Sequence, residues 1–155
     1  MRPNVMRAAL CAALTVGLAT MAVRAHHSFT MFDGAREEVL AGEVARWAFN
    51  APHVLMYIRD AKGTIWGFEG AAPATVVSRT PRVDGLTFKT GDQVTVIYCP
   101  LRDGRSGGAI GLVVTRDGAW YNPADGPCRP DEANWRNWLA GGYISRAQAE
   151  AAAKR

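Results

Sequence analysis

The sequence predicts a mainly β protein, a small closed barrel followed by a helical tail. Five short segments have the apolar patterns of β-strands, and turn residues separate them. A short helical stretch that begins at Pro73 follows the third strand, and two more strands come after it. This order is that of the five-stranded OB barrel, whose closure removes the exposed edges of short strands. An open β-sheet with one helix is the alternative fold.

The pattern along the chain places each strand of this OB-like barrel. The expected strands are residues 39–49, 54–59, 64–69, 93–99 and a fifth strand between residue 108 and the turn at Asp117-Gly118. Gly42 marks a bulge or a coil point in the first strand. The second strand should be central because it is apolar for five residues, and Gly63 suits the hairpin turn after it. In the fifth strand, Ile110, Leu112 and Val114 alternate with smaller neighbours.

Two helices are expected in the tail, residues 122–155. Asp131 can cap the first helix. One face of that helix carries three large apolar side chains, Trp135, Trp138 and Leu139. Ser145 and Gln148 form a capping box that opens the second, alanine-rich helix. We interpret the tail as a helical hairpin packed on the barrel; the alternative is a surface that docks a partner, since tryptophan-rich faces are common at interfaces.

Residues 1–25 have the three parts of a cleavable signal peptide. An arginine-containing start, an uncharged run over residues 8–23 and a small residue before position 26 follow one another. An uncleaved membrane anchor is the alternative, but a spanning helix needs about 20 apolar residues, and this run is shorter and rich in alanine. The sequence therefore predicts a periplasmic or secreted protein that begins at His26, with an N-terminal arm at 26–38 and the barrel domain at 39–121.

Cleavage changes the charge of the chain. The full sequence has 18 Lys and Arg against 14 Asp and Glu, a net charge of +4. Three arginines and no acidic residue precede position 26, so 15 basic residues then face 14 acidic ones. A nearly neutral chain gives no reason to expect a nucleic-acid partner. No later stretch is apolar for long enough to span a bilayer, so we do not expect an integral membrane protein after cleavage. The oligomeric state stays open.

Two cysteines lie after the signal, Cys99 and Cys128. In an oxidising compartment, a disulfide between them is the simplest expectation. In the chain-entropy model, closing a loop of this size contributes about 3 to 4 kcal/mol. Two separate thiols are the alternative.

A set of short motifs lies between residues 25 and 120. The set consists of Ala25-His26-His27-Ser28-Phe29, Pro52-His53, Trp66 with Glu69, Gly91-Asp92 and Leu101-Arg102-Asp103-Gly104. Together these motifs resemble a family of small exported bacterial proteins catalogued as domain of unknown function 6152. The resemblance implies export and a compact β domain, and it supplies no established activity. This chain has Asn50-Ala51-Pro52-His53 where the family more often has Asn-Pro-His, so its turn is one residue longer.

Three histidines, His26, His27 and His53, could provide nitrogen ligands for a metal ion. If the chain begins at His26, its α-amine and Nδ1 can chelate one metal, and His53 is the natural second imidazole. Ligands of this kind suit Cu(II) best among the common divalent metals. Glu69 or Asp33 could add an oxygen ligand or fix a histidine ring. The sequence thus predicts a copper site; the alternative is a frayed terminus, with His53 bonded to the backbone of its turn.

The glycine-rich loop of residues 101–108 is a second candidate site. In an OB barrel, the loop between the last two strands helps to frame the ligand face. Its arginines, Arg102 and Arg105, could bind an anion together with backbone N–H groups. The alternative is a solvated hairpin loop whose glycines serve the turn.

The sequence shows no convincing catalytic set. It has no Cys–His nucleophile pair, no His-x-x-x-His zinc spacing and no phosphate-loop glycine pattern. We therefore expect a binding protein rather than an enzyme, unless bound copper supplies the chemistry. Binding, delivery or sensing of copper is the first interpretation of its role. A metal-free periplasmic adaptor, which holds a protein or a small ligand on the barrel face and the tail helix, is the alternative.

Overall fold

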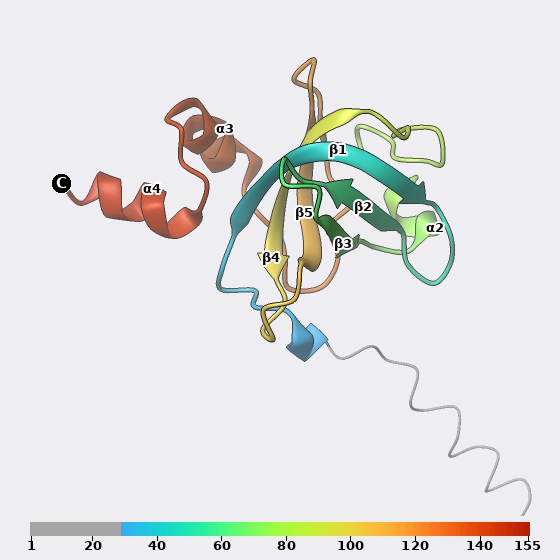
Figure 1. The fold of residues 1–155 in the computed structure, drawn as a ribbon, viewed down its shortest axis with the longest axis horizontal. Helices are drawn as coiled ribbons and strands as arrows, with labels where there is room; N and C mark the ends of the chain where they lie inside the picture. The colour runs from blue at the N-terminus through green and yellow to red at the C-terminus, as the bar shows by residue number, and fades with distance from the viewer. Residues whose placement is uncertain (1–28) are drawn as a thin grey trace, which may run out of the picture.

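A computed structural model describes residues 29–155 of the chain. The elements in chain order are η2 (Phe29–Met31), β1 (Glu38–Ala48), β2 (Leu55–Arg59), β3 (Ile65–Glu69), α2 (Pro73–Val76), β4 (Gln93–Pro100), β5 (Gly107–Thr115), β6 (Trp120–Tyr121), α3 (Glu132–Ala140) and α4 (Arg146–Ala153). Figure 1 shows the strands wrapped around one another, with α3 and α4 together on one side and α2 on the other. No helix among the described residues is long and apolar enough to cross a membrane.

The strands close into a barrel, which confirms the predicted fold class. The sheet order is β3-β2-β1-β4-β5-β6, and a parallel pairing between β3 and β5 closes the ring. This ring of five strands, with α2 directly after β3, is the arrangement of an OB barrel. The strand β6 was not predicted as a separate element, and it adds a short antiparallel pairing to β5 at Trp120 and Tyr121.

Strand β1 is long enough to pair with two neighbours, β2 and β4. Its register against β2 shifts between Val44 and Arg46, so the bulge lies at Ala45. Gly42 instead marks a point of close strand approach, because a Cβ there would collide with the carbonyl oxygen of Arg59. The predicted bulge at Gly42 is therefore wrong, since Gly42 pairs regularly with Val94 and the bulge lies three residues further along.

Strands β4 and β5 separate two apolar clusters, one inside the barrel and one outside it. Ile110 belongs to the inner cluster, whereas Leu112 belongs to the outer one with Trp135. The reason is an irregularity in the pairing with β4, which skips Gly111 and reverses the alternation of β5 at that residue. The predicted regular alternation of Ile110, Leu112 and Val114 is therefore wrong.

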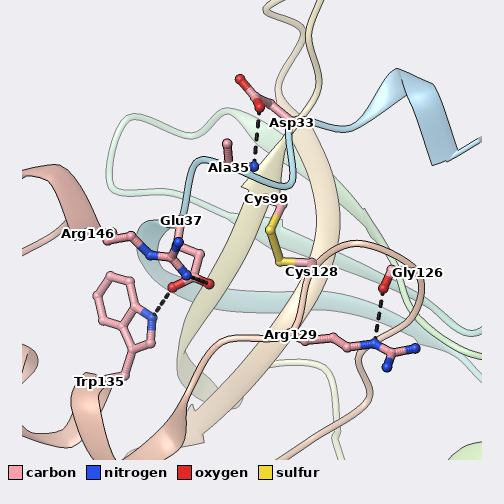
Figure 2. Close-up of a disulfide and its surroundings, with 9 residues drawn as sticks. All are labelled: Asp33, Ala35, Glu37, Cys99, Gly126, Cys128, Arg129, Trp135 and Arg146. Atoms are coloured by element: carbon pink, nitrogen blue, oxygen red, sulfur yellow. Dashed lines mark hydrogen bonds and ion pairs between the residues drawn. A yellow bond between two sulfur atoms is a disulfide. The ribbon is translucent and has the colours of Figure 1, made fainter.

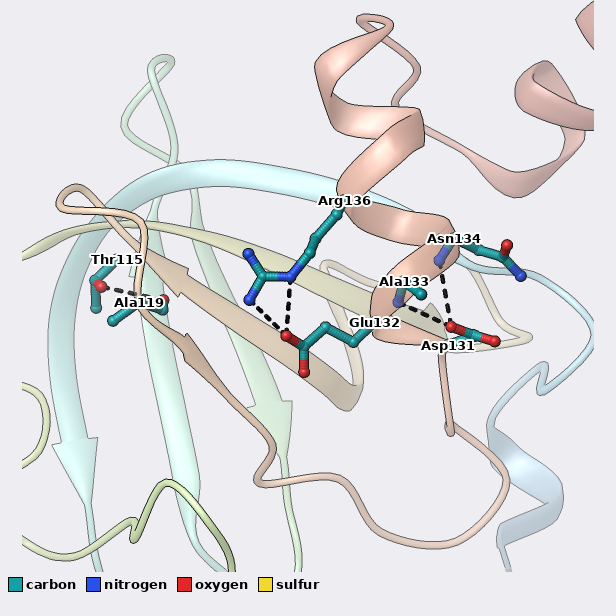
Figure 3. Close-up of polar contacts among 7 residues, drawn as sticks. All are labelled: Thr115, Ala119, Asp131, Glu132, Ala133, Asn134 and Arg136. Carbon is teal, nitrogen blue, oxygen red and sulfur yellow. Dashed lines mark hydrogen bonds and ion pairs between the residues drawn. The ribbon is translucent and has the colours of Figure 1, made fainter.

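The tail packs on the barrel through α3. The Asp131 carboxylate accepts hydrogen bonds from the backbone N–H groups of Ala133 and Asn134 and so caps the helix as predicted (Figure 3). Trp135 is fully buried in the outer cluster, and its Nε1 donates to Glu37 at 2.7 Å. The predicted helix cap at Ser145 is also present, since its Oγ accepts from the Gln148 N–H at 3.3 Å. The tryptophan face thus has a partner within the chain.

The Cys99–Cys128 disulfide is present, as predicted (Figure 2). It joins β4 to the loop that precedes α3, and both cysteines are fully buried. Phe32 and Ala109 pack against it and complete a small apolar cluster. The disulfide therefore fixes the loop between β6 and α3 to the end of the barrel at which the N-terminal arm arrives.

Candidate functional site

His53 lies just before β2 and is held by groups around its Nδ1 atom. Nδ1 is 3.0 Å from the carbonyl oxygen of Gly70. A carbonyl oxygen can only accept, so Nδ1 carries a proton; in the neutral imidazole the lone pair is then on Nε2. Two carboxylates flank the same nitrogen, with Glu69 Oε1 at 3.5 Å and Asp125 Oδ2 at 3.4 Å. A metal-bound histidine is usually oriented in this way, by a carbonyl or carboxylate on its other ring nitrogen.

The barrel and the disulfide-linked loop bring these side chains together. Glu69 ends β3 and pairs with Leu55, the first residue of β2. Asp125 comes from the loop between β6 and α3. A hydrogen bond from the Ala71 N–H, just after β3, to the Pro123 carbonyl at 2.9 Å joins this loop to the barrel. The His53 side chain is only 17% exposed. The imidazole is thus held in one orientation at the surface of the barrel, with most of its area covered.

The N-terminal arm reaches the same corner of the molecule. Phe32 is buried beside the disulfide and forms a β-bridge with Leu101. The ring of Phe29 lies against Gly126, because a Cβ on Gly126 would collide with it. Gly126 follows Asp125 in the chain. His26 and His27 lie outside the described residues, which begin at Phe29.

A hollow of about 210 Å³ lies on the outer face of the barrel beside this corner. Leu55 and Tyr57 of β2 and Gly67 and Glu69 of β3 contribute to its lining. The Tyr57 ring lies over Gly67, at an ordinary van der Waals distance of 3.6 Å from the position of a Cβ there. This is the face, between β2, β3 and the loop after β4, on which OB barrels bind ligands. Glu69 belongs both to the hollow and to the surroundings of His53.

The two arginines of the loop after β4 have separate partners. Arg102 Nε donates to the Thr30 carbonyl at 3.1 Å, and its Nη2 is 3.5 Å from Asp33. Arg105 Nε donates to Asp103 at 2.7 Å. The backbone N–H and the guanidinium of Arg105 lower the pKa of Asp103. The structure therefore uses Arg102 and Asp33 to hold the arm, and it places Arg105 at the edge of the hollow.

The same loop spells Gly-x-Ser-x-Gly, the spacing of a hydrolase nucleophile elbow, at residues 104–108. A nucleophile elbow connects a strand to a helix and exposes its serine at that turn. Here the segment connects β4 to β5, two antiparallel strands. The local structure is that of a hairpin loop, in which the backbone N–H and the guanidinium of Arg105 both contact the Asp103 carboxylate.

Asp125 is the site residue that the sequence analysis missed. It lies far from His53 in the chain, in a loop with no strand or helix pattern, and only the disulfide at Cys128 pointed to that region. Within residues 29–155, no group of three or more His, Cys, Asp or Glu side chains could hold a metal ion. Both carboxylates near His53 lie on its Nδ1 side, where they orient the ring.

Comparison with known proteins adds the family. No curated protein and no solved structure matches the chain. The model of a family of unknown function, DUF6152, matches residues 14–110. That match includes His53 and Glu69, and it ends before Asp125 and the helical tail. Because it covers more than half of the sequence, the chain belongs to the family of unknown function DUF6152.

Proposed function

We propose that the protein is an exported copper-binding protein whose site joins His53 to a processed N-terminal His26. The orientation of the His53 ring carries this proposal. Its Nδ1 donates to the Gly70 carbonyl between two carboxylates, which directs the lone pair of Nε2 to the other side of the ring. That is the tautomer and the support that metal-binding histidines have. Export rests on the signal-peptide pattern of residues 1–25.

The path of the arm supports a contribution from His26. Three peptide steps separate His26 from Phe29, and an extended chain spans at most about 3.6 Å per residue, or about 11 Å here. Phe29 packs against Gly126, next to Asp125, whose carboxylate is 3.4 Å from His53. The contacts of Phe29 with Gly126 and of Asp125 with His53 thus support a site that includes a processed N-terminus.

The ligand set determines which metal suits the site. The α-amine and Nδ1 of His26 would form a chelate, and Nε2 of His53 would bind opposite. A set of nitrogen ligands favours Cu(II) over the other common divalent metals. Copper displaces a proton from the α-amine, so its affinity rises with pH. The role that fits such a site is copper binding, delivery or sensing in the periplasm.

Copper titration of protein that begins at His26 tests the proposal. We expect one Cu(II) per chain, with nitrogen couplings in the electron paramagnetic resonance spectrum. Loss of a group that orients a metal ligand typically lowers metal affinity about 10- to 100-fold. His53 is itself a proposed ligand, so His53→Ala should lower the affinity at least that much. Glu69→Gln and Asp125→Asn should each cost less than His53→Ala.

The matched control is His27→Ala, which removes an imidazole next to the proposed chelate. It should leave the copper affinity nearly unchanged. Equal affinities for the wild type, His53→Ala and His27→Ala would contradict the proposal.

The hollow beside Tyr57 favours one alternative, a metal-free module that binds a small ligand on the barrel face. Its lining is largely apolar, with Glu69 and Arg105 at the rim. Trp135 is buried against the barrel, so in this alternative the barrel face binds the ligand without the α3 tryptophan. Protein that begins at His26 and binds no copper would favour this function.

A further inference from the structure

Two arginines line one hollow that includes neither His53 nor Glu69. Arg79 follows α2, and Arg129 precedes α3. Both line a hollow of about 290 Å³, together with Asn122, Ala124 and Pro130. None of these lining residues is acidic. The hollow thus carries two positive charges and no negative one in its lining.

Arg79 is fixed by neutral oxygen atoms. Its Nη1 donates to the carbonyl and side-chain oxygens of Asn122, both at 2.6 Å, and its Nη2 donates to the Ala124 carbonyl at 2.8 Å. These bonds hold the guanidinium in one orientation without using a carboxylate as the hydrogen-bond partner. The orientation of a binding group is therefore set before any ligand arrives, which lowers the entropic cost of binding.

Arg129 is held by a residue of its own loop, the one between β6 and α3. Its Nε donates to the Gly126 carbonyl at 3.2 Å, and Figure 2 shows the two Nη atoms directed away from that bond. Neither Arg79 nor Arg129 takes part in an ion pair with any residue in the range 29–155. The Nη groups of Arg129 and the Nε of Arg79 are thus available as charged donors.

The two positive charges lie close enough to affect each other. Burial lowers the pKa of the Arg79 guanidinium most; the Asp125 carboxylate is the next largest influence and raises that pKa, and the charge of Arg129 lowers it to a smaller extent. Like charges held near one another repel, and a bound anion would remove that repulsion.

We propose that Arg79 and Arg129 form a binding site for a small oxyanion, either a phosphate or the carboxylate of a small ligand. Guanidinium groups are planar, weakly hydrated and well suited to bidentate contacts with such anions. Arg79, held by Asn122 and Ala124, positions the anion, and the Nη groups of the exposed Arg129 side chain donate to it. Neither Arg79 nor Arg129 belongs to the proposed copper site.

Nuclear magnetic resonance of arginine Nε–H groups tests the site in protein that begins at His26. Sodium phosphate and sodium acetate are titrated separately at constant ionic strength, with sodium chloride as the reference. We expect saturable shifts of the Arg79 and Arg129 signals with at least one of the two anions, and no saturable shift of the exposed Arg116. Shifts with neither anion, or equal linear shifts of all three arginines, would overturn the proposal.

Arg129→Gln is the variant of choice because the side chain is exposed and its loss leaves the contacts of Arg79 intact. Loss of one charge-assisted contact should weaken anion binding at least tenfold. Arg116→Gln removes the same charge from another exposed position and should change the affinity less than twofold. An equal effect of both variants would show that only net charge attracts the anion, and the site would be refuted.

Discussion

At the scale of single residues, Glu37 makes the most consequential contact outside the candidate site. It is 3% exposed, accepts from Trp135 Nε1 at 2.7 Å and forms an ion pair with Arg146 (Figure 2). One carboxylate thus joins the start of β1 to both tail helices. Breaking a buried ion pair costs more than the pair contributes, because the remaining charge is left without a partner.

Glu37→Gln should therefore destabilise the protein. Arg146 is 36% exposed, so water partly screens the charge left behind, and we expect a loss of about 2 kcal/mol in the free energy of unfolding. Urea denaturation monitored by tryptophan fluorescence measures it. Glu43→Gln, at a half-buried position with no ion pair among the described residues, should cost less than about 0.5 kcal/mol. Similar values for both variants would show that Glu37 does not hold the tail.

Asp60 makes the turn between β2 and β3 sensitive to acid. Its carboxylate accepts from Trp66 Nε1 at 3.0 Å and from the backbone N–H groups of Lys62 and Thr64. The Trp66 hydrogen bond is the largest influence on the Asp60 pKa and lowers it. Because its pKa is lower in the folded protein, ionised Asp60 stabilises the fold. This stabilisation is fully present above the ordinary pKa of an aspartate and is lost as the pH falls through the lowered pKa.

The expected result is a flatter dependence of stability on pH in Asp60→Asn than in the wild type. Unfolding free energies measured by urea from neutral pH down into the acid range would show it. Glu150→Gln, at an exposed position of α4, should keep the wild-type slope. An unchanged slope in Asp60→Asn would contradict the role assigned to Asp60.

At the scale of elements, the positions of the strands could be predicted from the sequence. Which side of the sheet each side chain of β5 faces could not. The turn residues and apolar runs located all five barrel strands because these signals are local. The side-chain reversal in β5 depends on its register against β4, where Gly111 is skipped. Pro130 of the loop before α3 packs over Gly111, where a Cβ would collide with it. A contact between segments so distant in sequence leaves no periodic signal within β5.

The loop before α3 is the element on which both proposed sites depend. It carries Asp125 and Arg129, and the Cys99–Cys128 disulfide fixes it to β4. Because both cysteines are fully buried, alkylation of the unreduced, exported protein should label neither of them. Replacing both by serine should lower the free energy of unfolding by about 3 to 4 kcal/mol. Two thiols that react before reduction would contradict the disulfide.

At the scale of the whole molecule, the barrel interior and the outer cluster are separate cores. The inner cluster contains no residue of the tail beyond Tyr121. The outer one packs Trp135 against Ile97, Leu112 and Trp120 on the outer side of the strands. The barrel can therefore close without α3, although loss of the helix exposes apolar surface on β4 and β5.

A chain that ends near Tyr121, with Cys99→Ser, should keep β-type circular dichroism and a cooperative melt. Its melting temperature should fall, because Ile97, Leu112 and Trp120 lose their cover. Loss of both the β signal and the cooperative melt would show that the tail is part of one indivisible core.

Part of the candidate site could be predicted because, as for the strands, the signals are local in the sequence. His53 and Glu69 stand out because of their residue types and their positions at strand ends. The sequence could not show that both carboxylates face Nδ1, nor that Asp125 joins them, since these depend on barrel closure and on the disulfide. The structure adds the orientation of the His53 ring, and that orientation supports the proposed site.

The most direct test of the central claim compares the copper affinity of two chains that differ by one residue. One begins at His26, and the other carries a single methionine before it, which removes the α-amine of His26 from the chelate. We predict one tightly bound Cu(II) in the first chain, with affinity rising with pH, and an affinity at least about 10- to 100-fold lower in the second. Equal copper affinity in the two chains would contradict it.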